Sequence, residues 1–526
     1  MVAAETFGPE LESRPGKYGR WGGALFPAGL LAAALVLLGL GLDHQLLWQD
    51  EAQTALIGRT ILDHGLPLGT DGLNLFSQES GAEYGSDFIW RWHTWLQFYA
   101  VALSFQLLGQ STLAARLPFV LFGAGTMVLQ YFFALRLTSS RWTAVFSAVL
   151  LLLCVPFLIL SRQCRYYSPL AFFSLGALHA YLGLVNGRPG SLAWLVAAAT
   201  LVFHTHQFFW ATLLVTLILH ASIFHPSKIK PVLIALALTL ILTGPWLVWL
   251  APAKYLQSYG SEFLSLTAAA DKMLVFFDQV NFGVWPWYLL LAAAALAVIQ
   301  KLKDRTSAIP PRRLQGPLAL ILLYIAVNLA ALSLTAPSAY FRYLTPLIPL
   351  FLVLAGILAG AAWTWRPWAG AAVLAAVLLP QPLPAYFYEI THDFGSPTKC
   401  LIEFLRARAE DGDVAAITYG DLPLKFYTRL RVVGGLTGED PSLARQARWV
   451  IIRPWVMGRP DYLVKKYYLE NLDLKRYRPH VLNCGDYPHE NRESPEVHPF
   501  REPIGHSPLI VFERPGPAAG VPTPPR

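Results

Sequence analysis

Charged residues are scarce in this chain: Asp, Glu, Lys and Arg make up only 14% of its 526 residues, while hydrophobic residues make up 55%. So few charges argue against a soluble or disordered chain, and they indicate a protein that crosses a membrane several times. The formal net charge is +8. In a membrane protein this excess reflects the sidedness of the loops, so we expect no nucleic-acid partner.

Cysteine is also rare, with four residues, and neither a Cys-x-x-Cys pair nor the spacing of a zinc site occurs. A glycine-rich phosphate loop, a Gly-x-Ser-x-Gly turn and a dinucleotide-binding fingerprint are absent too. These absences remove the support for ATP or soluble nucleotide-sugar chemistry. We interpret Cys154 and Cys164 as packing residues. Cys400 and Cys484 are expected within bonding distance, although two unrelated thiols would fit the sequence equally well.

Long apolar segments are abundant. A helix of about 20 apolar residues spans a bilayer, and candidates lie at 24–42, 93–109, 113–135, 142–160, 168–185, 190–206, 207–224, 231–250, 285–300, 317–335, 343–360 and 369–385. If 93–109 does not span, the loops on the N-terminal side carry most of the arginine and lysine residues, as the positive-inside rule requires. We therefore predict about eleven transmembrane helices, with 93–109 lying in the interface or dipping back.

This topology divides the chain into four parts. Residues 1–23 are predicted to be a cytoplasmic N-terminal segment, and residues 24–385 a transmembrane domain that begins with a retained first helix. Residues 386–513 carry many charges and no spanning segment, so we predict a small extracytoplasmic α/β domain. The tail 514–526 is rich in proline and glycine and is predicted to be disordered.

The α/β prediction depends on short apolar runs that alternate with a helical pattern. Residues 414–418, 431–433 and 449–452 are typical of buried strands, and residues 396–409 have helical spacing.

An acidic pair, Asp50 and Glu51, opens the first outer loop, which is predicted to run over residues 43–112. Trp48 beside the pair suits the membrane interface. Residues 52–62 are predicted to form an amphipathic helix resting on the membrane, with the two carboxylates at its N-terminus, where the helix dipole favours negative charge. Such a pair could activate a hydroxyl group or bind a metal. A helix cap or a solvated acidic loop remains the alternative.

Two arginines and two tyrosines follow the third predicted span: Arg162, Arg165, Tyr166 and Tyr167. Arginine binds phosphate oxygens through two parallel hydrogen bonds, so these residues could clamp a phosphate. Anchoring to lipid head groups would also explain them.

Two further groups are predicted on the same side. Arg342 and Tyr343 precede a late span and could neutralise a lipid phosphate or act as an anchor. His93, His204 and His206 are candidates for substrate binding, although a lone histidine pair is more often structural.

The order of these motifs resembles the GT-C superfamily of polytopic glycosyltransferases, closest to the bacterial branch of aminoarabinose lipid A transferase and protein O-mannosyltransferases. The acidic motif after the first helix and the Arg-Tyr-Tyr loop carry the resemblance together with Arg116-Leu117-Pro118, Pro245-Trp246, Arg342-Tyr343-Leu344-Thr345-Pro346 and a C-terminal outer domain. It covers about residues 24–385.

The resemblance implies transfer of a hexose or pentose from a polyprenyl-phosphate donor to an acceptor on the outer side of a bacterial plasma membrane. The acceptor would be a lipid, glycan or protein of the envelope. Asp50 would match the family's catalytic aspartate and act as general base, with Glu51 as an auxiliary or structural partner. Arg162, Arg165, Tyr166, Tyr167, Arg342 and Tyr343 would hold the donor phosphate.

The loop 161–169 lacks the second carboxylate that some members have. We therefore expect no metal ligands and no required cofactor; a divalent cation is possible but not favoured. The alternative functions are a lipid or solute transporter or flippase, and a membrane anchor for a partner-binding domain. A transporter would favour charged residues within the spans and related halves, which the sequence does not display.

Overall fold

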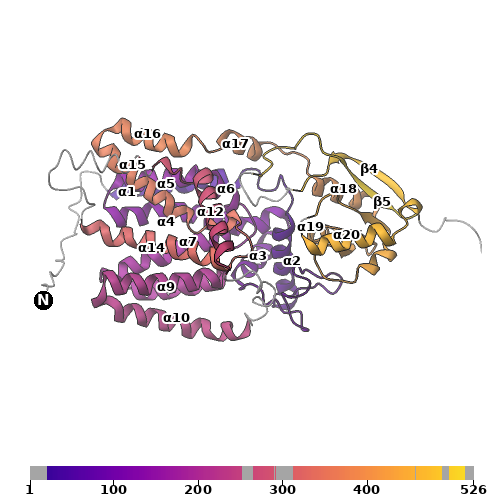
Figure 1. The fold of residues 1–526 in the computed structure, drawn as a ribbon, viewed down its shortest axis with the longest axis horizontal. Coiled ribbons are helices and arrows are strands. Elements are labelled where there is room, and N and C mark those ends of the chain that lie inside the picture. The colour runs from indigo at the N-terminus through magenta and orange to yellow at the C-terminus, as the bar shows by residue number, and fades with distance from the viewer. Residues whose placement is uncertain are drawn as a thin grey trace, which may run out of the picture.

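The computed structural model describes residues 20–250, 265–289, 291, 312–456, 458–488 and 497–515. A helical part and a smaller α/β part lie end to end along the long axis of the molecule (Figure 1). The predicted segment 1–23 and the predicted tail 514–526 fall largely outside the described residues.

Among the described residues, six helices are long and apolar enough to cross a membrane, or up to eight spans if each of two bent helix pairs counts as one. The long helices are α4 (Thr112–Thr138), α7 (Tyr167–Val185), α9 (Gln207–Phe224), α10 (Ile229–Trp249), α14 (Arg312–Thr335) and α15 (Ile348–Trp365). The bent pairs are α5 (Arg141–Leu152) with α6 (Val155–Ser161), and α16 (Pro367–Leu378) with α17 (Leu383–Thr391). The apolar stretch Ala24–Gly39 of α1 (Arg20–Gly39) is shorter, as is α8 (Ser191–Thr205). The short helix η1 (Pro226–Lys228) precedes α10.

Ten of the eleven predicted spans therefore correspond to described helices or helix pairs, and the segment 285–300 lies largely outside the described residues. Segments 142–160 and 369–385 were predicted as single helices, but they bend by 62° and 58°. Helix α12 (Leu266–Gly283) was not predicted. Helix α3 (Leu96–Leu108) has 13 residues, which gives about 20 Å, too short for a hydrocarbon core of about 30 Å.

Proline explains both bends, because its ring removes a backbone donor and cannot continue a helix. Pro156 begins α6 and Pro382 precedes α17. Gln381, in the second break, accepts the Val155 N–H in the first at 3.0 Å and donates to the Gly283 carbonyl at 3.0 Å. The two breaks therefore dock on each other and satisfy backbone groups that the bends release.

The acidic pair begins helix α2 (Gln49–His64), which is longer than the predicted 52–62. Its apolar side does not rest on a membrane as predicted. Ala55, Leu56 and Ile61 are buried in a core that also contains residues of α3, α4 and the C-terminal domain. Gly58 makes the α2–α3 contact possible, since a Cβ there would lie 2.8 Å from the side chain of Val101. Protein therefore covers α2 on both sides (Figure 1).

The C-terminal part contains a five-stranded sheet in the order β2-β1-β3-β5-β4, as the α/β prediction requires. The strands are β1 (Val414–Ile417), β2 (Arg431–Gly434), β3 (Trp449–Ile451), β4 (Arg478–Gly485) and β5 (Pro508–Glu513). The helices are α18 (Pro397–Arg408), α19 (Asp421–Tyr427) and α20 (Arg459–Asn471), with η3 (Pro441–Gln446) and η4 (Leu474–Arg476). Strands β1, β2 and β3 are parallel, and β5 is antiparallel to both neighbours. Strands β4 and β5 were not predicted.

Cys400 and Cys484 form a disulfide between α18 and β4, with their Cα atoms 6.6 Å apart. The expected proximity is thus confirmed. Cys154 and Cys164 are free and buried, as packing residues are.

Helix α19 ties the C-terminal domain to α2. Gln49 donates to the Asp421 carboxylate at 2.8 Å and accepts the Leu422 N–H at 3.3 Å. Asp421 also pairs with Lys425 at 2.6 Å, and neither side chain is exposed. Because Gln49 directly precedes Asp50, these contacts fix the position of the first turn of α2.

Candidate functional site

Asp50 meets two arginines from distant segments of the chain. Its Oδ2 atom lies 3.3 Å from the Arg342 guanidinium and 3.6 Å from that of Arg165. The carboxylate is 14% exposed, so it is neither sealed in the core nor free in solvent. The structure thereby brings together the predicted base and two of the predicted phosphate ligands.

Arg165 lies in the turn between α6 and α7 and donates to the Thr54 hydroxyl at 3.1 Å and the Asp50 carbonyl at 3.2 Å. Burial lowers the pKa of its guanidinium, but Asp50 together with Tyr167 and Tyr166 outweighs burial and leaves the pKa raised. Arg165 therefore stays charged. A buried cation next to a single carboxylate is well placed to receive a second anion.

Arg342 is supplied by the short helix η2 (Phe341–Leu344). Its guanidinium lies over the rings of Tyr340 at 4.4 Å and Tyr343 at 5.9 Å. Cation–π contacts of this kind hold an arginine in place without occupying all of its donors. Tyr343 thus lies beside Arg342, as the prediction for the phosphate site requires.

Glu51 does not face the same space as Asp50. Its side chain is fully buried and pairs with Arg116 through bonds of 2.6 Å and 2.8 Å. It also accepts the Cys164 N–H at 2.7 Å, while Arg116 donates to the Leu42 carbonyl at 2.7 Å. Glu51 therefore joins α2, α4 and the loop before α7. Of its two predicted roles, the geometry favours the structural partner.

Arg162 lies apart from Asp50, in contrast to its predicted place among the phosphate ligands. It is 1% exposed and donates to the carbonyls of Leu38, Leu40 and Gly41 at 3.0, 2.7 and 2.8 Å. Carbonyls at the end of a helix have no partner within it. Arg162 satisfies those at the end of α1, and this explains a buried arginine without any ligand.

Tyr166, His93 and His206 cluster beside Arg165. The Tyr166 ring lies 4.8 Å from His206 and 6.1 Å from His93, and Arg165 lies 5.7 Å from the Tyr166 ring. Burial and the charge of Arg165 lower the pKa of His206 to about 4 and that of His93 well below its usual value. Both imidazoles are therefore neutral at physiological pH, suited to hydroxyl groups rather than to phosphate.

The other two predicted residues lie at the margin of this cluster. His204 packs against Trp246, with ring centroids 5.2 Å apart, and so belongs to a tryptophan cluster with Trp95 and Trp249. Tyr167 is 1% exposed and packs on Tyr166 at 4.8 Å.

Within the described residues, no group of three or more His, Cys, Asp or Glu side chains is placed to hold a metal ion. Asp50 is surrounded by donors instead. Besides the two arginines, the Gln78 amide donates to its Oδ1 atom at 3.1 Å. Such a donor set suits an anion and leaves a cation few ligands.

Sequence reasoning missed Gln78, Thr54 and the role of Arg116. Gln78 and Thr54 are neutral residues, one in a long loop and one inside a helix, and no pattern separates them from others. Arg116 was noted only as part of the family motif. Its charge beside an apolar segment was the available signal, because a buried arginine is costly unless acceptors surround it.

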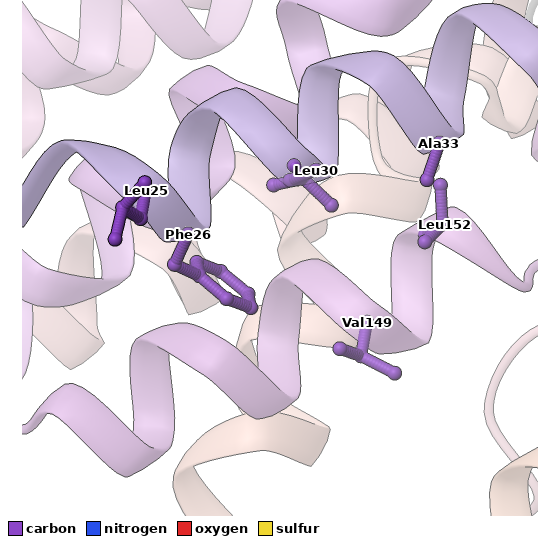
Figure 2. Close-up of a pocket in the computed structure, with 7 residues that line it drawn as sticks. Leu25, Phe26, Leu30, Ala33, Val149 and Leu152 are labelled. Atoms are coloured by element: carbon purple, nitrogen blue, oxygen red, sulfur yellow. The ribbon is translucent and has the colours of Figure 1, made fainter. Parts of the chain in front are cut away.

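A separate apolar pocket lies between α1 and α5 (Figure 2). Its lining is wholly apolar and consists of Leu25, Phe26, Gly29, Leu30, Ala33, Val149 and Leu152. It lies toward the N-terminal end of α1, whereas Asp50 follows the C-terminal end. Without polar groups it cannot orient a substrate.

Several solved structures have a similar fold. The structure of ArnT from Cupriavidus metallidurans bound to undecaprenyl phosphate matches with a TM-score of 0.55 and 14% identity, over 96% of this chain and 100% of that chain. The archaeal oligosaccharyltransferase AglB from Archaeoglobus fulgidus, in complex with an inhibitory peptide and a dolichol-phosphate, matches with a TM-score of 0.54 and 12% identity, over 88% of this chain and 73% of that chain.

Arabinofuranosyltransferase AftD from Mycobacteria matches with a TM-score of 0.53 and 16% identity, over 94% of this chain but only 40% of that chain. No family model and no curated protein matches this chain. The likeness is thus one of fold, and the activity has to be argued from the site.

Proposed function

We propose that this protein is a membrane glycosyltransferase that moves a sugar from a polyprenyl-phosphate donor to a hydroxyl group of an envelope acceptor. The observation that carries the proposal is the Asp50 carboxylate, held between Arg165 and Arg342 at 3.6 Å and 3.3 Å. A base and two phosphate ligands at one point are what glycosyl transfer from a lipid phosphate needs. Solved structures of the same fold contain undecaprenyl phosphate and dolichol-phosphate.

The chemistry follows from the charges. The acceptor oxygen attacks the anomeric carbon, its proton passes to Asp50, and the bond between that carbon and the phosphate oxygen breaks. Polyprenyl phosphate leaves with the electron pair. A positioned base contributes about 10²–10⁴-fold, and Arg165 and Arg342 stabilise the charge that develops on the leaving phosphate. A single displacement inverts the anomeric configuration.

The arginines have two successive partners in this scheme. Before the donor binds, they neutralise Asp50. The donor phosphate, a diester with one negative charge, competes with Asp50 for the guanidinium groups, and it binds them more strongly as it becomes the more highly charged monoester on leaving. Neither a metal ion nor a cofactor is required. Neutral His93 and His206, beside Arg165, are candidates for contacts to sugar hydroxyl groups.

The position of the protein follows from the same proposal. Its membrane is a bacterial plasma membrane, with residues 386–513 and the acceptor on the extracytoplasmic side. A transporter or flippase would favour charged residues within the spans, whereas Asp50 lies outside the predicted spans. A simple membrane anchor would not need Arg165 and Arg342 beside Asp50.

The test is release of polyprenyl phosphate by purified protein supplied with polyprenyl-phosphate hexoses and pentoses. Asp50→Asn should lower turnover by about 10²-fold or more, with folding and lipid binding intact. If Asp50 merely caps α2, asparagine is nearly as good a cap, and activity survives. Arg342→Ala should also raise the donor concentration needed for half-maximal rate, because that arginine binds the phosphate in the ground state too.

A further inference from the structure

Gln78 contacts Asp50 on the side that the arginines leave open. Its amide donates to Oδ1 at 3.1 Å, whereas Arg342 and Arg165 both approach Oδ2. Each carboxylate oxygen has two lone pairs. Gln78 therefore occupies one lone pair of Oδ1 and leaves the other for a hydroxyl group.

A compact turn over residues 77–83 holds Gln78 in place. The Glu83 carboxylate is 1% exposed, and its Oε1 atom accepts the backbone N–H groups of Gln78 at 2.6 Å and Glu79 at 3.0 Å. Its Oε2 atom pairs with the hydroxyl of Ser77, which also accepts the Gly81 N–H at 2.6 Å. One buried carboxyl group thus organises the whole turn.

Two contacts attach the turn to other elements of the fold, one just before its start and one at its tip. Gln53 of α2 donates to the Phe76 carbonyl at 2.9 Å, just before the turn. At its tip the Ser80 N–H donates to the Leu436 carbonyl of the C-terminal domain at 3.2 Å. Ser80 also lies against Gly438, where a Cβ would come within 2.7 Å of the Ser80 backbone. The turn is therefore clamped between α2 and the C-terminal domain.

We propose that Gln78 is a positioning residue for glycosyl transfer, held by Glu83, which fixes the Asp50 carboxylate so that the free lone pair of Oδ1 faces the acceptor hydroxyl. This inference rests on the proposed function, since it presumes that Asp50 is the base. The arginines approach only Oδ2, at 3.3 Å and 3.6 Å, so Gln78 adds a restraint on the other oxygen, at 3.1 Å. Misplacement of a reacting group by about 1 Å can cost about 10²-fold in rate.

The experiment compares Gln78→Ala, Glu83→Ala and Glu83→Gln with the wild type in the polyprenyl-phosphate release assay. Gln78→Ala should lower kcat by about 10- to 100-fold and leave the donor KM within about twofold, because Arg165 and Arg342 are untouched. Loss of the amide donor should also shift the acidic limb of the kcat profile to higher pH, since a carboxylate without that donor takes up a proton more readily.

Glu83 supplies a matched pair of variants that do not touch Asp50. Glutamine keeps an oxygen for the two backbone N–H groups and loses only the acceptor of the Ser77 hydroxyl, so Glu83→Gln should retain more of the wild-type kcat than Glu83→Ala. Glu83→Ala removes these bonds and should reproduce the loss seen in Gln78→Ala. Near wild-type kcat in Gln78→Ala would overturn the positioning role. An unshifted pH profile of this variant, together with a lowered thermal midpoint, would overturn it as well.

A double variant separates this inference from the proposed function. In an Asp50→Asn background, Gln78→Ala should cost little more, because residues that act as a unit are not additive. An equal further loss would show that Gln78 acts elsewhere and would reject the inference alone. Full activity of Asp50→Asn would instead reject the assignment of the base and with it the proposed mechanism.

Discussion

Two neighbouring carboxylates, Asp50 and Glu51, have opposite surroundings. Glu51 is fully buried and bound by Arg116 at 2.6 Å and 2.8 Å, so its charge is neutralised inside the protein. Asp50 is 14% exposed and its arginine contacts are longer, at 3.3 Å and 3.6 Å. Adjacent positions in the first turn of a helix point in directions about 100° apart, and this gives the two carboxylates different surroundings.

The two arginines of the Arg162–Arg165 loop should also separate in experiment. Arg165→Ala should lower transfer and weaken the use of donor while the protein still folds, since Arg165 reaches Asp50 and Thr54. Arg162→Ala should lower the thermal midpoint instead, because it leaves carbonyls at the end of α1 without a partner. Thermal melts and donor kinetics of both variants check this. Equal kinetic defects at equal stability would contradict it.

Glu83 predicts a dependence of stability on pH. Burial raises its pKa to about 7 from an ordinary 4.5, against the hydrogen bonds from Ser77 and Gln78 that lower it. Between these two values the folded protein holds a proton that the unfolded chain has released. The free energy of unfolding should therefore fall as pH rises from about 4.5 to about 7 and then level off. Melts across this range should show a smaller slope for Glu83→Gln, and an unchanged slope would contradict the assignment.

At the residue scale, sequence reasoning found the charged part of the site and misplaced its buried part. Asp50, Arg165 and Arg342 were predicted together because charged residues beside membrane spans are costly and usually functional. Arg162 was grouped with them by proximity in sequence, since nothing in a linear pattern reveals that it turns toward α1. Gln78 could not be found, because a neutral residue gains its role only through the folded turn.

At the scale of elements, helix α2 is the part of the fold that positions the site. It carries Asp50 in its first turn and is packed between α3 and α4 on one side and α19 on the other. Its helical character could be predicted from an acidic start and apolar spacing. Its burial could not, because the partner α19 lies more than 350 residues away in sequence.

The docking of α19 can be tested through Lys425, which pairs with Asp421 at 2.6 Å and donates to the Leu75 carbonyl at 2.8 Å. Lys425→Met leaves a buried carboxylate without its cation, which typically costs about 3–5 kcal/mol. Stability should fall by that order, and turnover should fall with it. The control is Lys466→Met: this residue pairs with Glu470 at 3.9 Å on exposed α20, where a salt bridge contributes little. Equal effects of both substitutions would contradict the docking role.

The helix breaks belong to the same scale. Apolar runs at 142–160 and 369–385 were predicted as single spans because the hydropathy of a segment does not show where its helix axis bends. The prolines in them were the available signal for a break. That Gln381 joins the two breaks could not be predicted, since the pairing exists only after both segments have packed.

At the scale of the whole molecule, the fold class could be predicted almost entirely from composition and charge. Apolar segments located the helices, and three short runs located β1, β2 and β3. Strand β4, at the edge of the sheet, was missed because polar residues interrupt it. Strand β5 lies between β3 and β4, and its apolar run 509–512 was an available signal. Helix α12 was missed because its acidic and basic residues lower its hydropathy.

The sidedness of the molecule is the prediction on which the location of the site depends. Within the described residues, Asp50, Arg165 and Arg342 converge at one end of the helical part, where the C-terminal domain docks on α2. All of them must therefore be on one side of the membrane. By the positive-inside rule, the basic loop at 225–230 predicts that the opposite end faces the cytoplasm. Reporter fusions after Gly316 and after Glu389 should give a cytoplasmic signal at the first and an extracytoplasmic signal at the second. A cytoplasmic signal at Glu389 would mean that the protein has the opposite orientation in the membrane. The acceptor would then lie in the cytoplasm, while the contacts among Asp50 and its arginines would remain as they are.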